Sequence, residues 1–579
     1  MPEAPRARPK PLLLQARPYR WLPLVGFIVL AIALTAPLSL HPTRLARLDG
    51  DGQFSIWNVG WVAHSLSIDP LNVWNANIFY PSRTTLAYSE ANLMAGAFAA
   101  PVYAATGNVF LALNLVLVTS FILSAGATYA LVTYLTGDRR AAAVSAIAFA
   151  FCPFVFAHLS HIQLLMTAGL PLSLLCFHRL SDRPDIRRGV ALGLALAAQT
   201  YACAYYGIFA VLLIGLATLL LAVLRRDLNQ RSYWTAVLVG ALVSAAIVAP
   251  LALVYARFGS ETGFERPLEQ ARLYSATPGS YLASAAYAHQ WLLPLAGKWR
   301  EVLFPGFIAT ILGAGGAVVG LRHARRAPVI VLYTTIGLVA LWASFGPDAG
   351  LYRVLHETVP AFTFLRAPVR FGLIVQLALA VLAGFAVAEI LRRRSRPLLW
   401  TCLLLAVAAG ESVKPLKFSP VPAVDPVYRT LAGLPYGGVI ELPLYSRRFA
   451  FLRTKYMLAS TAHWKPLVGG YSDYMPGRAI ALEGVLGGFP TRESLDQLAR
   501  DEVRYAVVHP ADYSAAEREK FEARLREFST EIRPLQTSGA AELYEILTRI
   551  PNANPATIPS AFGLLPSDAA RRVRFQVDR

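Results

Sequence analysis

The sequence predicts an α-helical polytopic membrane protein that ends in a small α/β domain, and three observations carry this prediction. Hydrophobic residues form 55% of the 579 residues and charged residues only 15%, whereas about 25% charged is usual in soluble domains. Apolar runs of span length recur as far as Gly410, and about 20 residues cross a bilayer. From Glu411 onward charges become frequent and the apolar runs shorten to strand length, which indicates a domain outside the lipid.

Eleven apolar segments are predicted to cross the membrane. They are Trp21–Leu40, Val109–Leu135, Ala141–Ala157, Ile162–Leu180, Gly189–Cys203, Tyr205–Leu224, Trp234–Ala256, Val302–Leu321, Pro328–Phe345, Phe371–Ile390 and Leu398–Gly410. The basic residues 1–20 precede the first segment. A cleaved signal peptide is the alternative there, but its apolar core is usually about 7–15 residues long. If the short segment Leu398–Gly410 does not cross, the C-terminal domain changes sides.

Charge assigns the sides of the membrane. The net charge of +19 lies largely in short clusters between the apolar segments, and such clusters stay cytoplasmic. This arrangement requires that Ala91–Thr106 does not cross, so we expect a juxtamembrane or re-entrant helix there. The N-terminus is then cytoplasmic and the C-terminal domain extracytoplasmic. Nucleic acid is not indicated as a partner, and the four cysteines, all within apolar runs, indicate neither disulfides nor zinc.

The C-terminal domain is predicted to cover residues 411–551. Its expected elements are three buried strands and one charged amphipathic helix. They are Val439–Leu442, Tyr505–His509 and Ala541–Ile546 for the strands, and Ser514–Phe528 for the helix. Residues 552–579 form a tail that is Pro-rich and then basic.

A long polar interval, residues 41–90, follows the first span and is predicted to be the first outer loop of the transmembrane domain, residues 21–410. It begins with Asp49 and Asp51 in Leu48-Asp-Gly-Asp-Gly and contains many Trp and Tyr residues, which settle at headgroup depth. We therefore expect it along the membrane surface. Asp-Gly-Asp-Gly is also typical of a plain turn. Asp49 lies nearer the helix end, where a capping role competes with a chemical one.

Polar residues elsewhere on the predicted outer side are the other candidates. His158 and His161 are spaced to share a helical face, and with Gln163 they are predicted to bind substrate or to be hydrogen-bonded interfacial side chains. Four cations suit an anionic ligand at the membrane surface, because Arg offers bidentate geometry to phosphate. They are Arg272, Lys298, Arg366 and Arg370.

The C-terminal domain contributes a further predicted group. His463, Trp464 and Tyr471 lie in two stretches, Ser460–Pro466 and Gly469–Tyr474, that are rich in side chains able to stack on or hydrogen-bond to sugars. We expect them on the acceptor side of a site. A surface loop with turn residues is the competing interpretation.

The whole arrangement resembles the GT-C class of membrane glycosyltransferases, and in detail uncharacterised bacterial members, including those of the YfhO type. The stretches that carry the resemblance are Leu48–Asp51, His158–Gln163, Phe364–Phe371 and Ser460–His463. The resemblance implies a bacterial cytoplasmic membrane enzyme, a polyprenyl-phosphate-sugar donor, and a glycan, lipid or protein acceptor. It also implies that Asp51, with Asp49 second, is the catalytic base or a ligand of a divalent cation. The signature Trp-Trp-Asp-Tyr-Gly is absent, so protein N-glycosylation is not implied.

Inverting transfer from a lipid phosphate needs one base for the acceptor proton and cations for the departing phosphate. Asp51 is the predicted base, and the four cations are the predicted phosphate ligands. Metal dependence stays open, with Asp49, Asp51, Glu90, His158 and His161 as the possible ligands. Two other classes of protein remain: a transporter or flippase of envelope precursors, which should show ionisable residues at mid-bilayer or internal repeats, and a non-catalytic membrane scaffold.

Overall fold

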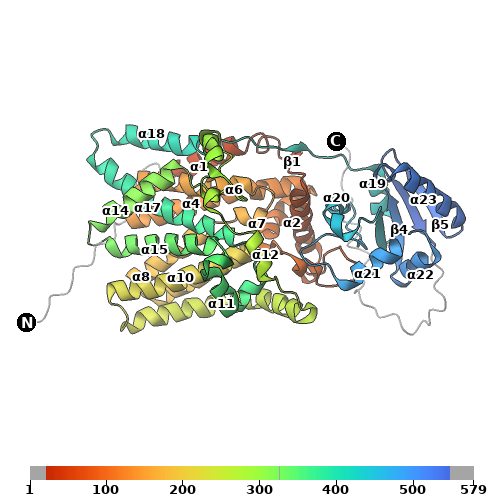
Figure 1. The fold of residues 1–579 in the computed structure, drawn as a ribbon, viewed down its shortest axis with the longest axis horizontal. Helices are drawn as coiled ribbons and strands as arrows, with labels where there is room; N and C mark the ends of the chain where they lie inside the picture. Colours follow the sequence, from red (N-terminus) through yellow and green to blue (C-terminus); the bar gives the residue numbers. More distant parts are fainter. Residues whose placement is uncertain (1–20, 325, 548–579) are drawn as a thin grey trace, which may run out of the picture.

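The computed structural model describes residues 21–324 and 326–547, so the predicted basic N-terminus and the tail from residue 552 lie outside it. The molecule is elongated (Figure 1). A bundle of helices runs along its long axis, and a domain with a β-sheet lies at one end. The helix α2 (Gly50–Ile68) crosses that end of the bundle between the two parts. We call this end of the bundle the α2 end.

Seven helical segments in the described residues are long and apolar enough to cross a membrane, so the chain is a multi-pass membrane protein. They are α4 (Val109–Thr136), α5 with α6 (Arg139–Ala157), α7 with α8 (Ile162–Asp182), α10 (Ala204–Arg225), α11 (Arg231–Thr262), α15 (Ala327–Ser344) and α17 with the turn before it (Pro368–Arg393). The other predicted spans fall on shorter helices. They are α1 (Leu22–Thr35), α9 (Ile186–Ala202), the segment Ile308–Leu321 and α18 (Pro397–Gly410).

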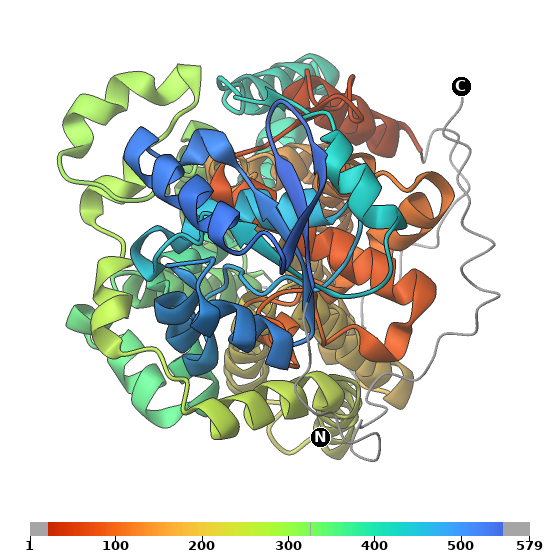
Figure 2. The ribbon, with the colours of Figure 1, turned by 90° about the vertical axis from the view of Figure 1, so that its right-hand side faces the viewer.

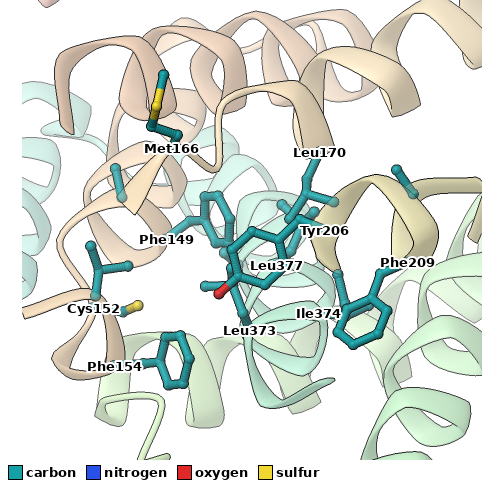
Figure 3. Packing of buried hydrophobic residues seen from close by; sticks show 14 of the residues in the cluster. Phe149, Cys152, Phe154, Met166, Leu170, Tyr206, Phe209, Leu373, Ile374 and Leu377 are labelled. Atoms are coloured by element: carbon teal, nitrogen blue, oxygen red, sulfur yellow. The ribbon is translucent and has the colours of Figure 1, made fainter. Parts of the chain in front are cut away.

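The span that contains α17 (Gly372–Arg393) lies at the centre of the bundle. Inside the protein, 94% of its most apolar stretch is buried, whereas only 17% is buried for α11. Figure 3 shows Leu373 and Leu377 of α17 packed with Phe149 of α5 and Tyr206 of α10. Because α17 is enclosed by its neighbours, the turn that begins it is held in a fixed place.

The Asp-Gly-Asp-Gly stretch of the first outer loop begins a helix rather than a plain turn. Asp49 is the N-cap of α2, and its Oδ1 accepts the backbone N–H of Gly52 at 2.8 Å. An Asp cap followed by an apolar and aromatic run favours a helix over an isolated turn. Gly52 is needed because a Cβ there would lie 2.3 Å from the carbonyl oxygen of Arg47. The next helix, α3 (Leu93–Thr106), has 14 residues, about 21 Å, which is short for a span.

The C-terminal domain contains a four-stranded sheet in the order β3-β4-β6-β5. β3 (Gly438–Leu442) is parallel to β4 (Val503–Val508), and β6 (Glu542–Ile546) is antiparallel to β4. These strands and α23 (Ala515–Glu527) occupy the predicted places. The edge strand β5 (Ile532–Thr537) was not predicted, because its residues are partly exposed and include Pro534. Figure 2, seen from this end, shows the domain over the end of the bundle.

The C-terminal domain is docked on the first outer loop through backbone hydrogen bonds. The N–H of Tyr80 donates to the carbonyl of Leu467 at 2.9 Å, and the N–H of Leu467 donates to the carbonyl of Asn77 at 2.9 Å. The Asn77 side chain accepts from the Trp57 indole of α2 and donates to Ser460. These hydrogen bonds connect the residues that follow β3 to the first outer loop and to α2.

Candidate active site

Asp49 and Asp51 have different surroundings at the start of α2. Asp49 forms an ion pair with Arg47 at 2.5 Å and accepts the Ser160 hydroxyl at 2.9 Å, besides capping the helix. Asp51, in the first turn, has a side chain that is 58% exposed, and its Oδ2 lies 3.4 Å from Nε2 of His161. Asp49 is thus engaged in holding the helix start, while Asp51 is open to a ligand.

The two histidines occupy the link between α6 (Pro153–Ala157) and α7 (Ile162–Leu165). Nδ1 of His158 is 2.8 Å from the carbonyl of Phe154, and its Nε2 is 3.6 Å from Oε2 of Glu301. Burial lowers the pKa of His158 to about 3, so the ring is neutral. Burial also lowers the pKa of His161, although Asp51 opposes this shift.

Arg366 lies two residues before the turn η8 (Pro368–Phe371) that begins α17, and Arg370 lies within this turn. The Arg370 guanidinium stacks 4.1 Å from the ring centre of Tyr205. Among the residues that the structure describes, it has no carboxylate within ion-pair distance. Nη1 of Arg366, in contrast, lies 3.2 Å from Oδ1 of Asp473. Arg370 is therefore the cation that is available to an anionic ligand.

The positive charge of Arg370 acts to lower the pKa of three carboxyl groups. Burial raises the pKa of Glu301, and Arg370 opposes that rise. Burial likewise raises the pKa of Glu90 to about 7, while its Oε1 accepts the backbone N–H of Ala204 at 3.0 Å. Arg370 also helps to lower the pKa of Asp473. The α2 end thus holds a group of acids around one stacked guanidinium.

Comparison with known proteins tests the fold. No family model matches the sequence, and no curated protein matches it. The solved structure of the arabinofuranosyltransferase AftD from Mycobacteria aligns with 91% of this chain at a TM-score of 0.54 and 16% identity, and the match spans 42% of AftD. This chain has the GT-C fold.

Two further solved structures align at lower TM-scores. The oligosaccharyltransferase of Archaeoglobus fulgidus in the apo form has 13% identity over 85% of this chain and 70% of its own, with a TM-score of 0.48. ArnT from Cupriavidus metallidurans, bound to undecaprenyl phosphate, has 13% identity over 91% of this chain and 98% of its own, also with a TM-score of 0.48. The finer resemblance to YfhO-type members stays an expectation.

Within this GT-C fold, two predicted phosphate ligands lie apart from the Asp51 group. Arg272 is ion-paired with Glu269 and, at 2.8 Å, with Asp348. Lys298 is exposed, and its backbone carbonyl accepts the Thr277 hydroxyl at 2.8 Å. Arg272 is thus an ion-paired residue of the helix α12 (Leu268–Leu273), and Lys298 is an exposed residue of the link after α13 (Leu293–Ala296). Arg366 and Arg370 are the pair that the fold brings to the α2 end.

The predicted substrate-binding residues also divide. Tyr471 packs edge-on against Phe54 of α2, 6.0 Å between ring centres, and the charge of Asp51 acts on its hydroxyl. Trp464 instead stacks on His64 at 4.8 Å in the domain interface. His463 precedes Trp464 in the chain, and burial lowers its pKa to about 3. Gln163 lies two residues after His161, and its buried Oε1 has no hydrogen-bond partner among the described residues.

A divalent cation was a prediction for Asp49 and Asp51. Asp49 is already shared by Arg47, Ser160 and the helix start. Within residues 21–324 and 326–547, no three His, Cys, Asp or Glu side chains form a group that could hold a metal ion. Asp51 and His161 alone do not make a complete donor set.

Four residues at this site were absent from the predicted catalytic, phosphate-binding and substrate-binding residues, although Glu90 was named as a possible metal ligand. They are Glu90, Glu301, Lys414 and Asp473. Three of them share a signal, since Glu90 and Glu301 immediately precede apolar segments and Lys414 follows one closely. Lys414 lies 5.6 Å from the ring centre of Phe156, and burial lowers its pKa to about 7. Asp473 has no such signal in the sequence.

Proposed function

We propose that this protein transfers a sugar from a polyprenyl-phosphate-linked donor to an extracytoplasmic hydroxyl acceptor, with inversion, in the bacterial cytoplasmic membrane. The observation that supports the proposal is that an accessible carboxylate, Asp51, and an available cation, Arg370, are found at the same end of the membrane bundle. The charges of Asp51 and Arg370 both act on the pKa of His161: Asp51 raises it and Arg370 lowers it. The GT-C fold supports the same assignment.

Asp51 serves as the general base in this proposal. It takes the proton of the acceptor hydroxyl while that oxygen bonds to the anomeric carbon and the bond from this carbon to the phosphate oxygen breaks. The electron pair leaves with the phosphate, so the proton ends on Asp51 and the added negative charge on the carrier phosphate. Neutral His161 at 3.4 Å orients the Asp51 carboxylate.

Arg370 stabilises the departing phosphate. This guanidinium is held by stacking on Tyr205 and has no ion-pair partner within residues 21–324 and 326–547. It therefore offers its N–H groups to phosphate oxygens without first breaking an ion pair. Arg366 adds a second positive charge nearby, although part of it is balanced by Asp473. A phosphate-linked leaving group needs no general acid, which agrees with the lowered pKa of His158.

The test is turnover and donor binding in the same detergent-purified variants. Asp51→Asn keeps the shape and removes the base, so transfer from polyprenyl-phosphate-linked sugars should fall about 100-fold or more. Binding of undecaprenyl phosphate, followed by native mass spectrometry, should be unchanged. Asp138→Asn is the matched control. Asp138 is also an aspartate at the start of a helix, but it forms its ion pair with Arg140, away from the site.

Three outcomes contradict the proposal. Substantial turnover by Asp51→Asn refutes the base. Transport of the carrier across liposomes by both wild type and Asp51→Asn, with no transfer by either, favours the flippase alternative. Absence of both carrier binding and transfer in the wild type favours the scaffold.

A further inference from the structure

Asp473 belongs to the C-terminal domain but lies among loops of the membrane part. Its Oδ1 is 3.2 Å from Nη1 of Arg366, and its Oδ2 is 2.9 Å from Nη2 of Arg266. The Ser89 hydroxyl donates to the same Oδ2 at 3.2 Å. One carboxylate therefore joins three segments that are far apart in the sequence.

Arg266 in turn fastens two loops together. Its backbone N–H donates to the carbonyl of Thr363 at 2.8 Å, and its Nε donates to the carbonyl of Phe364 at 3.1 Å. Its side chain is only 9% exposed. The segment before Arg366 is thus held by Arg266, and Asp473 holds both arginines at once.

Arg366 has two more contacts that define its place. Its backbone N–H donates to the Tyr205 hydroxyl at 2.6 Å, and its guanidinium lies 5.3 Å from the ring centre of Tyr274. Tyr205 is also the ring on which Arg370 stacks. The backbone of Arg366 and the guanidinium of Arg370 therefore contact the same tyrosine.

The loop that carries Asp473 is anchored without it. The N–H of Tyr474 donates to the carbonyl of Tyr88 at 3.1 Å, and its ring packs edge-on against Tyr88 and Phe258, at 5.1 and 5.3 Å between ring centres. A Cβ at Gly470 would lie 2.8 Å from Ile78, so the backbone approaches closely there. Removing the Asp473 charge should leave the domain docked.

The Asp473 carboxylate stays ionised in this setting. Burial disfavours its charge, but Arg366 and Arg266 together outweigh burial and lower its pKa below the usual range. Two arginines with one partly exposed carboxylate leave one net positive charge. A cation held in a fixed geometry binds phosphate better than a mobile one.

We propose that Asp473 is a positioning residue through which the C-terminal domain completes the phosphate-binding side of the site, by holding Arg366 beside Arg370. This inference rests on the proposed function. It makes the transmembrane bundle alone insufficient, because the side chain that orients Arg366 comes from the other part of the chain.

The decisive measurement is the affinity of the detergent-purified full chain for undecaprenyl phosphate by native mass spectrometry. A carboxylate near a phosphate repels it, so Asp473→Asn should raise affinity if only charge matters. Positioning predicts the opposite, a fall of about 10-fold, with partial recovery in Asp473→Glu. In an Arg366→Ala background, Asp473→Asn should have no further effect. Asp512→Asn, which removes the Lys455 ion pair of the same domain, is the control and should bind like wild type.

Hydrogen exchange of the unliganded protein separates this inference from the proposed function. Asp473→Asn should speed exchange in residues 362–371 and leave residues 77–80, where the domain docks, unchanged. Unaltered exchange in residues 362–371, or carrier affinity that is equal or higher in Asp473→Asn, overturns the positioning role. A wild type that does not bind the carrier refutes the proposed function instead, while the exchange result still decides the role of Asp473.

Discussion

Glu90 is a residue of the site whose charge state changes near neutral pH. Burial raises its pKa to about 7, against the opposing effects of the Ala204 N–H and of Arg370. Below that pH it is neutral, and above it a negative charge appears next to the cation that is available for phosphate. Because the folded-state pKa is raised, Glu90 favours the folded state most at low pH, and this contribution is lost as the pH rises through about 7.

Phosphate binding should respond to this titration. We expect the affinity for undecaprenyl phosphate to weaken between pH 6 and pH 8 more in the wild type than in Glu90→Gln, which cannot ionise. The carrier phosphate also titrates in this range, with a second pKa of about 6, so the difference between the two proteins is the quantity to measure. Parallel pH profiles would show that Glu90 does not reach the phosphate.

At the scale of elements, α9 and α11 pack through glycines. A Cβ at Gly189 would lie 2.3 Å from the carbonyl oxygen of Ala236, and a Cβ at Gly193 would lie 2.5 Å from that of Gly240. Small residues allow this close approach between helices in a membrane. The contact joins α11, the span least buried in the protein, to the rest of the bundle.

Gly193→Ala should therefore destabilise the bundle by about 1–3 kcal/mol through overpacking, and lower the midpoint of thermal unfolding in detergent. Gly215→Ala in α10 is the matched control, since no atom of the described residues lies within 4 Å of the Cβ it would add. Alanine has the higher helix propensity, so this control should be neutral or slightly stabilising. Equal midpoints for the two variants would mean that the α9 and α11 contact yields without cost.

At the scale of the whole molecule, the predicted topology places the α2 end and the C-terminal domain outside the cell membrane. In a cysteine-free background, a membrane-impermeant thiol reagent applied to intact cells should label Leu71→Cys and Ala515→Cys, both exposed near or beyond the α2 end. It should not label Asn229→Cys or Arg394→Cys, which lie in exposed basic links. The reverse pattern would place the site in the cytoplasm.

The sequence by itself determined the polytopic class, the acid at the start of the first loop, the cation pair before α17 and three strands of the sheet. These features depend on local hydropathy and on residues a few positions apart, so they leave a signal in a single chain. Only the tertiary structure decided that Asp49 caps a helix while Asp51 stays open, and that Arg272 pairs with Asp348.

Only the tertiary structure, too, brought Glu90 to Ala204 and Asp473 to Arg366. Such contacts join segments more than a hundred residues apart. A single carboxylate has no sequence periodicity that would indicate which residue it contacts. Its role depends on burial and on neighbouring charges, which exist only after the helices and the C-terminal domain have packed together.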